Sequence, residues 1–488
     1  MRGSGSRNRS GWARVACGAA VGIFGIQLAS SLAFLAIARA EEETPATGPG
    51  STPTPPPTPP PTPASGDQDG RLEELEEKVD VLAEEMGRLE AIFAVPEDMR
   101  LESFNGLGPA ASKVYKKGDG LSIGGYGEVR LRHFTDQKDD NQNDIFDALR
   151  AVLYVGYKYN DRWVVNSELE FEHAGTGGGG SVSTEFLTVD YLWREELNFR
   201  VGLVLVPMGF INEIHEPTFF YGAARPEVER RILPTTWREN GGGVFGTVAD
   251  RVQYRMYAIN GFNGEGFDNN GLRGGRQNGS EALANDFAFV GRVDVDVVPG
   301  LLLGGSVYVG QSGQDQDFTS SIDDVTRDLP DALTTIYELH GQYKGHGLSL
   351  RVLWTEAYID QAGRLSRVLD KGFTNDGNGN RVLTNTGDSI AQQMRGWYAE
   401  AAYDVMPFIL PDSRMTLEPY FRYEYYDTQR EVSNLGYTRD KAKKIDLYTA
   451  GLQFKPIPQV VFKVDYRHFD PAEGHRADEV QALVGYVF

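Results

Sequence analysis

The segment from Pro207 to Arg238 holds the residues best suited to chemistry, because it combines aromatic rings with charges of both signs. The charged residues that we expect at a constriction are Glu213, Glu216, Arg225, Arg230 and Arg231. Guanidinium groups around a narrow aqueous path attract anions and replace part of their hydration. We therefore expect this segment to fold into a lumen and to narrow it. The alternative is an exposed loop, on which the arginines pair with Glu227 and Glu229 at little energetic gain.

Further arginines recur on the polar faces of alternating segments elsewhere in the chain. We expect them to line the lumen: Arg130, Arg132, Arg150, Arg200, Arg255, Arg292, Arg351, Arg422 and Arg467. Acidic residues such as Glu168, Glu170 and Asp294 share those faces. The charge pattern therefore favours anions only weakly.

Catalysis needs a nucleophile and a base within hydrogen-bond reach. None of the seven histidines lies in a recognisable motif, and the H-E-x-x-H and P-loop patterns are absent. The run from Asn375 to Asn380 is rich in oxygen ligands but lacks the terminal acidic residue of the known calcium loop, which favours a solvated loop. The sequence predicts no enzyme, no cofactor and no metal site.

Composition limits the class of protein that can hold these residues. The chain has 488 residues, with 48 basic and 69 acidic side chains, so its net charge is −21 and nucleic-acid binding is disfavoured. The negative mean hydropathy of −0.38 argues against a bundle of membrane helices. A membrane β-barrel stays open, because its strands are only half apolar.

The amino terminus predicts export. Four arginines between Arg2 and Arg14 precede an apolar stretch from Val15 to Ile37, and Ala38-Arg39-Ala40 has the small-residue pattern of a cleavage site. We expect a signal peptide over residues 1–40, with an uncleaved anchor helix as the alternative. The single cysteine, Cys17, would leave with the signal.

Three short regions are expected to follow. Residues 41–70 form a proline-rich linker, which acts as a stiff spacer. Residues 71–95 form a short α-helical coiled coil that self-associates through Leu72, Leu75, Val79, Leu82, Met86, Leu89 and Phe93. A lone amphipathic helix packed on its own domain is the alternative. Residues 96–120 connect this helix to the main domain.

Residues 121–488 have a period of two. Near the end of the chain, for example, Val464 and Tyr466 interleave with Lys463, Asp465 and Arg467. Such segments are typical of barrel strands. We count sixteen, which start near Leu121, Leu149, Arg162, Val182, Leu197, Glu239, Arg251, Asn285, Leu301, Thr334, Leu348, Ala391, Met415, Lys444, Gln459 and Ala477.

The connections between these segments alternate in length. Those after odd-numbered segments are mostly long and polar, and those after even-numbered segments are mostly short, such as Asn160-Asp161 and Pro299-Gly300. Outer-membrane barrels have this pattern. The chain ends on Phe488, with Tyr486 on the same face, and an aromatic terminal strand of this kind is similar to the assembly signal of such barrels.

These patterns together predict an all-β fold, a 16-stranded antiparallel transmembrane β-barrel preceded by the coiled coil. In lipid, a strand assembly must close to pair its backbone. Sixteen strands enclose a lumen too wide for side chains to fill. A water-filled diffusion channel follows from that geometry.

The chain resembles the phosphate-selective porin O and P family. The resemblance rests on Val206-Pro207-Met208-Gly209-Phe210, Asn212-Glu213, Glu216-Pro217, Arg225-Pro226 and the run from Pro234 to Gly241, with weaker matches at Gly124 to Glu128 and at Phe488. It implies a 16-stranded homotrimeric porin with an arginine-lined channel and an infolded third loop. The segment from Pro207 to Arg238 has no lysine, unlike phosphate-selective members, which favours general anion or small-solute passage over a tight phosphate site.

The expected partners are outer-membrane lipid, two further copies of the chain, the barrel assembly machinery and small permeating solutes or anions. The expected location is the bacterial outer membrane, with the amino-terminal extension in the periplasm. Two other roles stay open: a structural tether to the cell wall through the linker and coiled coil, and, more remotely, a barrel hydrolase.

Overall fold

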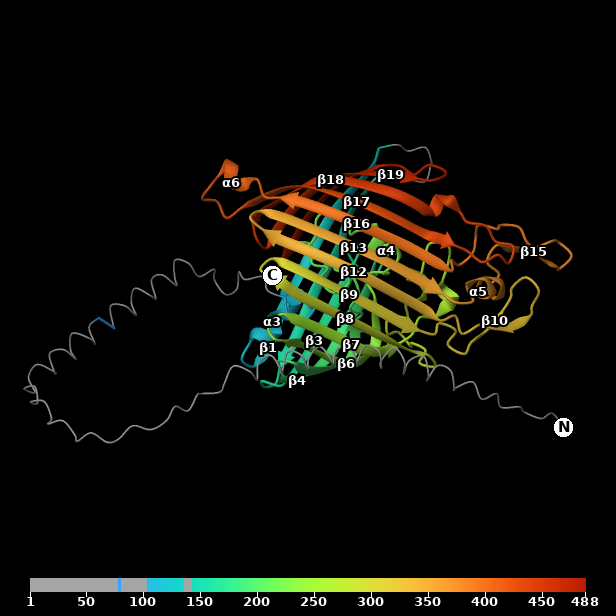
Figure 1. The fold of residues 1–488 in the computed structure, drawn as a ribbon, viewed down its shortest axis with the longest axis horizontal. Coiled ribbons are helices and arrows are strands. Elements are labelled where there is room, and N and C mark those ends of the chain that lie inside the picture. The colour runs from blue at the N-terminus through green and yellow to red at the C-terminus, as the bar shows by residue number, and fades with distance from the viewer. Residues whose placement is uncertain (1–77, 80–102, 136–142) are drawn as a thin grey trace, which may run out of the picture. The chain divides into compact units, whose positions relative to one another are not determined.

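The computed structural model describes residues 78–79, 103–135 and 143–488 (Figure 1). The chain divides into two compact units, Met1–Glu97 and Asp98–Phe488. The expected signal peptide and proline-rich linker lie outside the described residues. So does the expected coiled coil, except for Lys78 and Val79, which are helical.

The all-β prediction is confirmed, because sixteen strands of the second unit pair in antiparallel order and close into a barrel. The last strand pairs with the first, where Tyr126 lies opposite Val487. The barrel strands are β1 (Gly120–Phe134), β2 (Ile145–Lys158), β3 (Trp163–Glu172), β4 (Ser181–Arg194), β5 (Leu197–Leu205), β6 (Arg238–Val248), β7 (Val252–Asn260), β8 (Phe287–Val298), β9 (Leu301–Gly310), β12 (Thr334–Gly345), β13 (Leu348–Ile359), β16 (Gln393–Tyr403), β17 (Thr416–Glu431), β18 (Lys444–Ile457), β19 (Val460–Pro471) and β20 (Glu479–Val487).

The strands begin close to where the period-two pattern predicts. Each starts within two residues of its expected position except β2, which begins at Ile145 and not at Leu149. Asp147 interrupts the pattern there, and its carboxylate contacts His173 at 2.6 Å. A polar contact between β2 and the residue that follows β3 thus lies where the pattern requires an apolar residue.

Strand β19 illustrates how alternation separates the two faces of the barrel. Phe462, Val464 and Tyr466 are exposed on the outside, whereas Lys463, Asp465 and Arg467 are buried inside. A strand whose outer face is apolar and whose inner face is charged fits a closed barrel with a polar interior.

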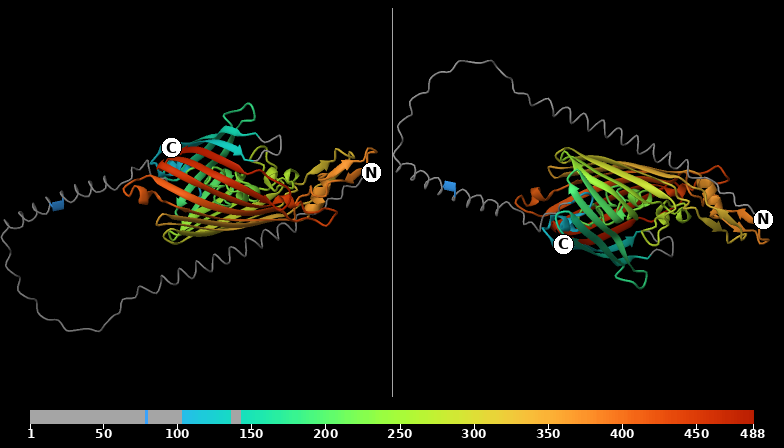
Figure 2. Two further views of the ribbon diagram at one scale, coloured as in Figure 1. Left: turned by 90° about the horizontal axis from the view of Figure 1, so that it is seen from above. Right: turned by 90° about the horizontal axis from the view of Figure 1, so that it is seen from below.

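Short helices and hairpins lie at the two ends of the barrel. The hairpins β10–β11 (Asp317–Thr319 and Thr326–Asp328) and β14–β15 (Phe373–Asn375 and Arg381–Leu383) lie with α5 (Ala362–Val368) at one end, here called the loop end (Figures 1 and 2). Helix α6 (Met406–Ile409) lies at the opposite, turn end (Figure 1). No helix among the described residues is long and apolar enough to cross a membrane.

Chain segments fill part of the barrel interior. Residues 206–237, here called the inner loop, include α4 (Glu227–Arg231), and the next long connection includes η2 (Gly264–Gly266) and η3 (Arg273–Gly275). Their aromatic rings pack together, with Trp237 stacked on Phe262 at 4.4 Å and tilted against Tyr308 at 5.0 Å. These rings belong to a large buried apolar cluster. The rest of the barrel interior is lined mainly by charged side chains.

Candidate functional site

The inner loop is held inside the barrel by cationic side chains of the wall. Lys463 of β19 donates to the carbonyls of Phe220 (2.6 Å) and Gly222 (3.0 Å), and Arg422 of β17 donates to that of Tyr221 (3.0 Å). Lys455 and Arg351 hold the two preceding carbonyls in the same way. Charge-assisted hydrogen bonds of this kind are stronger than neutral ones, so they fix the path of the loop.

The first part of the loop is fixed by two further arginines. Arg255 of β7 and Arg292 of β8 contact the Glu213 carboxylate at 3.3 and 3.5 Å, and both also contact Asp294. Arg292 donates to the Gly209 carbonyl. Glu213 was expected at a constriction, and the structure places it against this wall, with its charge matched.

The connector expected at residues 96–120 has a structure that sequence reasoning missed. Its helix α3 (Pro109–Lys116) lies inside the turn end of the barrel against β1, β2 and β3. Tyr115 donates to Asp190 (2.7 Å) and stacks on Phe104 (4.3 Å between ring centroids). At Gly156 of β2, a Cβ atom would lie 2.8 Å from Val114. The sequence signals for this helix are weak: Pro109 at its first turn, and Gly156 of β2, which leaves room for Val114 of the helix.

Glu216 joins this helix to the inner loop. It is fully buried, and its Oε1 accepts the N–H of Ala110 in the first turn of α3 at 2.9 Å. Burial raises the pKa of Glu216 to about 8, although the N–H groups of Ala110 and Ala111 oppose the shift. The neighbouring His215 contacts Glu168 at 3.0 Å, and burial lowers the pKa of this imidazole to about 4. Glu216 therefore positions α3 and does not face an open path.

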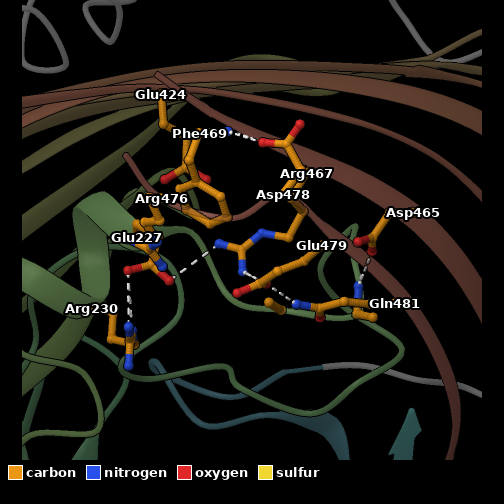
Figure 3. A network of polar contacts seen from close by, with 12 residues as sticks. Glu227, Arg230, Glu424, Asp465, Arg467, Phe469, Arg476, Asp478, Glu479 and Gln481 are labelled. Carbon is orange, nitrogen blue, oxygen red and sulfur yellow. Dashed lines mark hydrogen bonds and ion pairs between the residues drawn. The ribbon is translucent and has the colours of Figure 1, made fainter. Parts of the chain in front are cut away.

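Helix α4 carries an ion-pair network (Figure 3). Glu227 contacts Arg230 (3.0 Å), Arg231 (3.1 Å) and Arg467 (3.2 Å), and Arg467 also contacts Glu479 (2.8 Å). Burial opposes ionisation of Glu227, but the surrounding arginines outweigh it and hold its pKa well below the ordinary value. The pairing weighed for an exposed loop thus occurs inside the barrel, with Glu227 alone.

Glu229, the other carboxylate considered for that pairing, has different partners. It accepts the N–H of Ile211 and the hydroxyl of Tyr398, both at 2.7 Å. Burial raises its pKa. The turn of α4 is therefore attached to the barrel wall on one side and to the start of the inner loop on the other.

A cavity of about 250 Å³ lies between the inner loop and the wall formed by β1, β2, β19 and β20. Eight arginines and four glutamates line it, a formal excess of four positive charges with His173 counted as neutral. The arginines are Arg130, Arg132, Arg150, Arg225, Arg230, Arg273, Arg467 and Arg476. The arrangement can bind or guide an anion.

The four glutamates of this cavity are already paired, and several arginines are not. Glu128 and Glu172 contact Arg150 at 3.0 and 3.6 Å, and Arg467 pairs with the other two. Among the described residues, no carboxylate lies within 4.0 Å of a nitrogen of Arg130, Arg132, Arg225, Arg273 or Arg476, and Nε and Nη2 of Arg225 are buried without a hydrogen bond. Burial and the nearby Arg276, Arg230 and Arg225 lower the pKa of Arg273 to about 9, a sign of positive potential.

The nine arginines expected in the lumen thus fall into two groups. Seven contact a carboxylate: Arg150, Arg200, Arg255, Arg292, Arg351, Arg422 and Arg467. Arg130 and Arg132 do not, and both line the cavity. Sequence alternation places all nine on one face of their strands, but it carries no information on which of them are paired.

The run from Asn375 to Asn380 satisfies its own oxygens. The Asn375 side chain accepts the N–H groups of Gly377 and Gly379, and Asp376 accepts those of Asn378 and Asn380. Over the described parts of the chain, no group of three or more His, Cys, Asp or Glu residues is arranged to hold a metal ion.

Comparison with known proteins identifies relatives in sequence and in fold. No protein-family model matches the chain. Solved barrels with similar folds include the trimeric form of OmpT of Vibrio cholerae (12% identity, TM-score 0.47, 76% of this chain and 100% of that one) and the DcaP channel of Acinetobacter baumannii (12%, 0.45, 76% and 98%). OmpF of Salmonella typhi, solved with daunomycin, is 12% identical with a TM-score of 0.48 over 77% of this chain and 99% of that one. An uncharacterized protein of Aquifex aeolicus (strain VF5) is 32% identical over 391 residues, 79% of this chain and 84% of that protein, and the chain belongs to the same family as this protein.

Proposed function

We propose that the chain forms a water-filled channel across the bacterial outer membrane, through which small hydrophilic solutes diffuse with a preference for anions. A closed barrel with an apolar outer face satisfies every backbone group in lipid. The observation that carries the anion preference is the arginine-rich cavity beside the inner loop.

The balance of paired and unpaired charges in that cavity supports the preference. Its carboxylates are neutralised by Arg150, Arg230 and Arg467, so Arg130, Arg132 and Arg225 dominate the local field. In a narrow space with low-dielectric walls, such an excess raises the local concentration of anions. The inner loop then acts as the constriction, with Arg225 as its unpaired cation.

A second cavity supplies a route from the loop end. It has a volume of about 260 Å³, and Arg476 lines it together with the first cavity. Arg231, Lys443 and Glu473 also line it. With Arg476, its charged lining keeps an excess of positive charge, as expected for a path that admits and releases anions.

The finer features follow from the sequence patterns. The signal peptide and the aromatic terminal strand favour export and insertion by the barrel assembly machinery, with the amino-terminal extension in the periplasm. The resemblance to phosphate-selective porins favours a homotrimer, and it makes phosphate the first permeating solute to test.

Single-channel recording in planar bilayers, with a tenfold salt gradient, tests the proposal. The wild-type chain is expected to conduct. The sign of its reversal potential should show that anions permeate more readily than cations. The double variant Arg130→Gln/Arg225→Gln should lower the anion-to-cation permeability ratio several-fold, on the order of the loss of two unit charges in a narrow pore. Arg364→Gln is the matched control, because this arginine is exposed and distant from the cavity.

Two results would contradict the proposal. If the folded chain gave no conductance, the proposal that it forms a channel would be wrong. A wild-type reversal potential on the cation side would leave the channel but remove the anion preference.

A further inference from the structure

An ionic cluster lies on the outward face of the barrel, where side chains are otherwise mostly apolar. Glu356 of β13 is directly opposite Arg395 of β16 and Tyr337 of β12, at outward positions of their strands. Glu356 is only 2% exposed. Charged residues on a lipid-facing surface are costly and therefore mark functional sites.

The hydrogen bonds of the cluster leave the Arg395 guanidinium as its exposed charged group. One oxygen of Glu356 accepts from Arg395, and the other accepts from Tyr337 (3.0 Å), Gln393 (3.0 Å) and Tyr358. Arg395 uses its Nε for this contact, and no other hydrogen bond of its guanidinium occurs within the described residues. About a third of this side chain is exposed. The cluster thus presents the two Nη groups of Arg395 to the outside.

An apolar groove of about 700 Å³ begins at Arg395 and runs along the same strands. Trp354, Trp397, Leu339, Gly341 and Ala399 are among the residues that line it. A Cβ atom at Gly341 would lie 3.0 Å from Leu303 and 3.5 Å from Val352, so a larger residue there would crowd the lining of the groove. Its volume lies in the range of ligand sites.

The position of the cluster along the barrel bears on which partner could occupy the groove. Arg395 lies two residues from the loop-end terminus of β16, and Glu356 lies three residues from that of β13. At about 3.3 Å per residue, the cluster lies roughly 7–10 Å along the strands from their loop-end termini, and the strand tilt of a barrel makes its depth smaller. A cation this close to the loop end of a lipid-facing wall suits a lipid phosphate, whereas a second copy of the chain would have to supply a buried acceptor to Arg395.

We infer that this outward face binds one phosphate-bearing lipid of the outer leaflet, with an acyl chain in the groove and a phosphate on Arg395. The inference rests on the proposed function, because it requires the barrel to span a membrane. It adds a defined lipid site that is independent of the lumen.

Native mass spectrometry of the full mature chain in dodecyl maltoside, titrated with diphosphoryl lipid A, tests the site. The wild-type chain should retain one lipid A per chain against the excess of neutral detergent. Arg395→Gln should weaken retention about tenfold, since it removes charge-assisted hydrogen bonds. Ala399→Leu, which fills the groove, should weaken it at least as much.

Ala401→Leu is the matched control, because Ala401 is the next outward residue of β16 and does not line the groove. Heat-modifiable gel migration reports whether each variant is folded, and Gly341→Ala replaces Ala399→Leu if the latter does not fold. Equal retention by Ala399→Leu and Ala401→Leu would overturn the lipid site. So would dissociation of the oligomer by Ala399→Leu with unchanged lipid retention, which would make the groove a contact between copies. Conductance is recorded in parallel, so a failure of the channel proposal is distinguished from a failure of the lipid site.

Discussion

Arginines on two sides of the same lumen have opposite environments. On the paired side, Arg255, Arg292 and Arg422 each have two kinds of partner. They contact carboxylates of the barrel wall, and they also contact groups of the inner loop. On the unpaired side, Arg130, Arg132 and Arg225 surround the cavity without a carboxylate partner among the described residues. One residue type therefore serves as a structural attachment on one side and as a source of positive field on the other.

The difference follows from what lies within reach of each guanidinium. The paired side is covered by the inner loop, so its arginines are excluded from water and must be matched by carboxylates and carbonyls. The unpaired side lines the cavity, into which an anion could enter to partner guanidinium nitrogens such as the buried Nε and Nη2 of Arg225. The inner loop thus affects ion selectivity in two ways. It covers and neutralises the arginines of the paired side, and it contributes charged side chains of its own.

The largest expected effect is on stability, from Arg422→Met on the paired side. Arg422 is fully buried and contacts Glu400 (3.0 Å), Glu424 (2.9 Å) and two carbonyls of the inner loop. Its removal leaves the buried Glu424 without its cation and leaves Glu400 with only Arg351 at 3.8 Å, which should lower the free energy of unfolding by about 3–5 kcal/mol. Urea unfolding followed by tryptophan fluorescence measures it.

Arg132→Met on the unpaired side is the control for that experiment. Arg132 has no carboxylate partner among the described residues, so its replacement leaves no buried charge unpaired. The free energy of unfolding should therefore change by no more than about 0.5 kcal/mol. Equal losses for Arg422→Met and Arg132→Met would erase the distinction between the two sides.

The next effect is on selectivity, because Gln481→Glu gives the unpaired side a carboxylate. Gln481 lies opposite Arg132 in the pairing of β20 with β1, and it lines the cavity. A new ion pair there should cancel part of the positive field and lower the anion-to-cation permeability ratio about three- to tenfold. Reversal potentials in a salt gradient measure the ratio.

Gln342→Glu is the matched change on the paired side. Gln342 accepts from Arg351 at 3.0 Å and lies away from the cavity. Its effect on the permeability ratio should be smaller than that of Gln481→Glu, and the reverse order would show that the cavity is not where ions are selected.

A third effect concerns the carboxylate that attaches α3 to the inner loop. The pKa of Glu216 is about 8 in the folded chain, above the ordinary value near 4.5, so folding favours its protonated form. The free energy of unfolding should therefore fall as pH rises from about 4.5 through 8. Glu216→Gln mimics the protonated form, and it should remove this slope and stabilise the chain at pH 9 by about 1–3 kcal/mol.

Urea unfolding at pH 6 and pH 9 measures that difference. Glu265→Gln serves as the control, because Glu265 is an exposed loop residue. A pH dependence that persists unchanged in Glu216→Gln would mean that another group titrates there.

Sequence reasoning located the barrel far better than its contents. Alternation marked strands such as β9, β12 and β13 at their first residue. It did not find α3, because residues 109–116 make only about two turns of helix, too short to stand out by pattern, and they gain their stability from contacts with distant strands and with Glu216. The polar cluster around Glu356 was missed for a related reason, since an outward glutamate and an outward arginine become one feature only when strands pair in register.

Local pattern is sufficient for the number of strands, the face on which each side chain lies and the alternation of long and short connections, because these depend on residues one or two apart. Tertiary structure was needed to assign Glu213 and Glu216 to attachment, to bury Glu227 among three arginines and to leave Arg130 and Arg225 unpaired. Charge pairing depends on which side chains meet across the lumen, and those partners lie up to hundreds of residues apart in the chain.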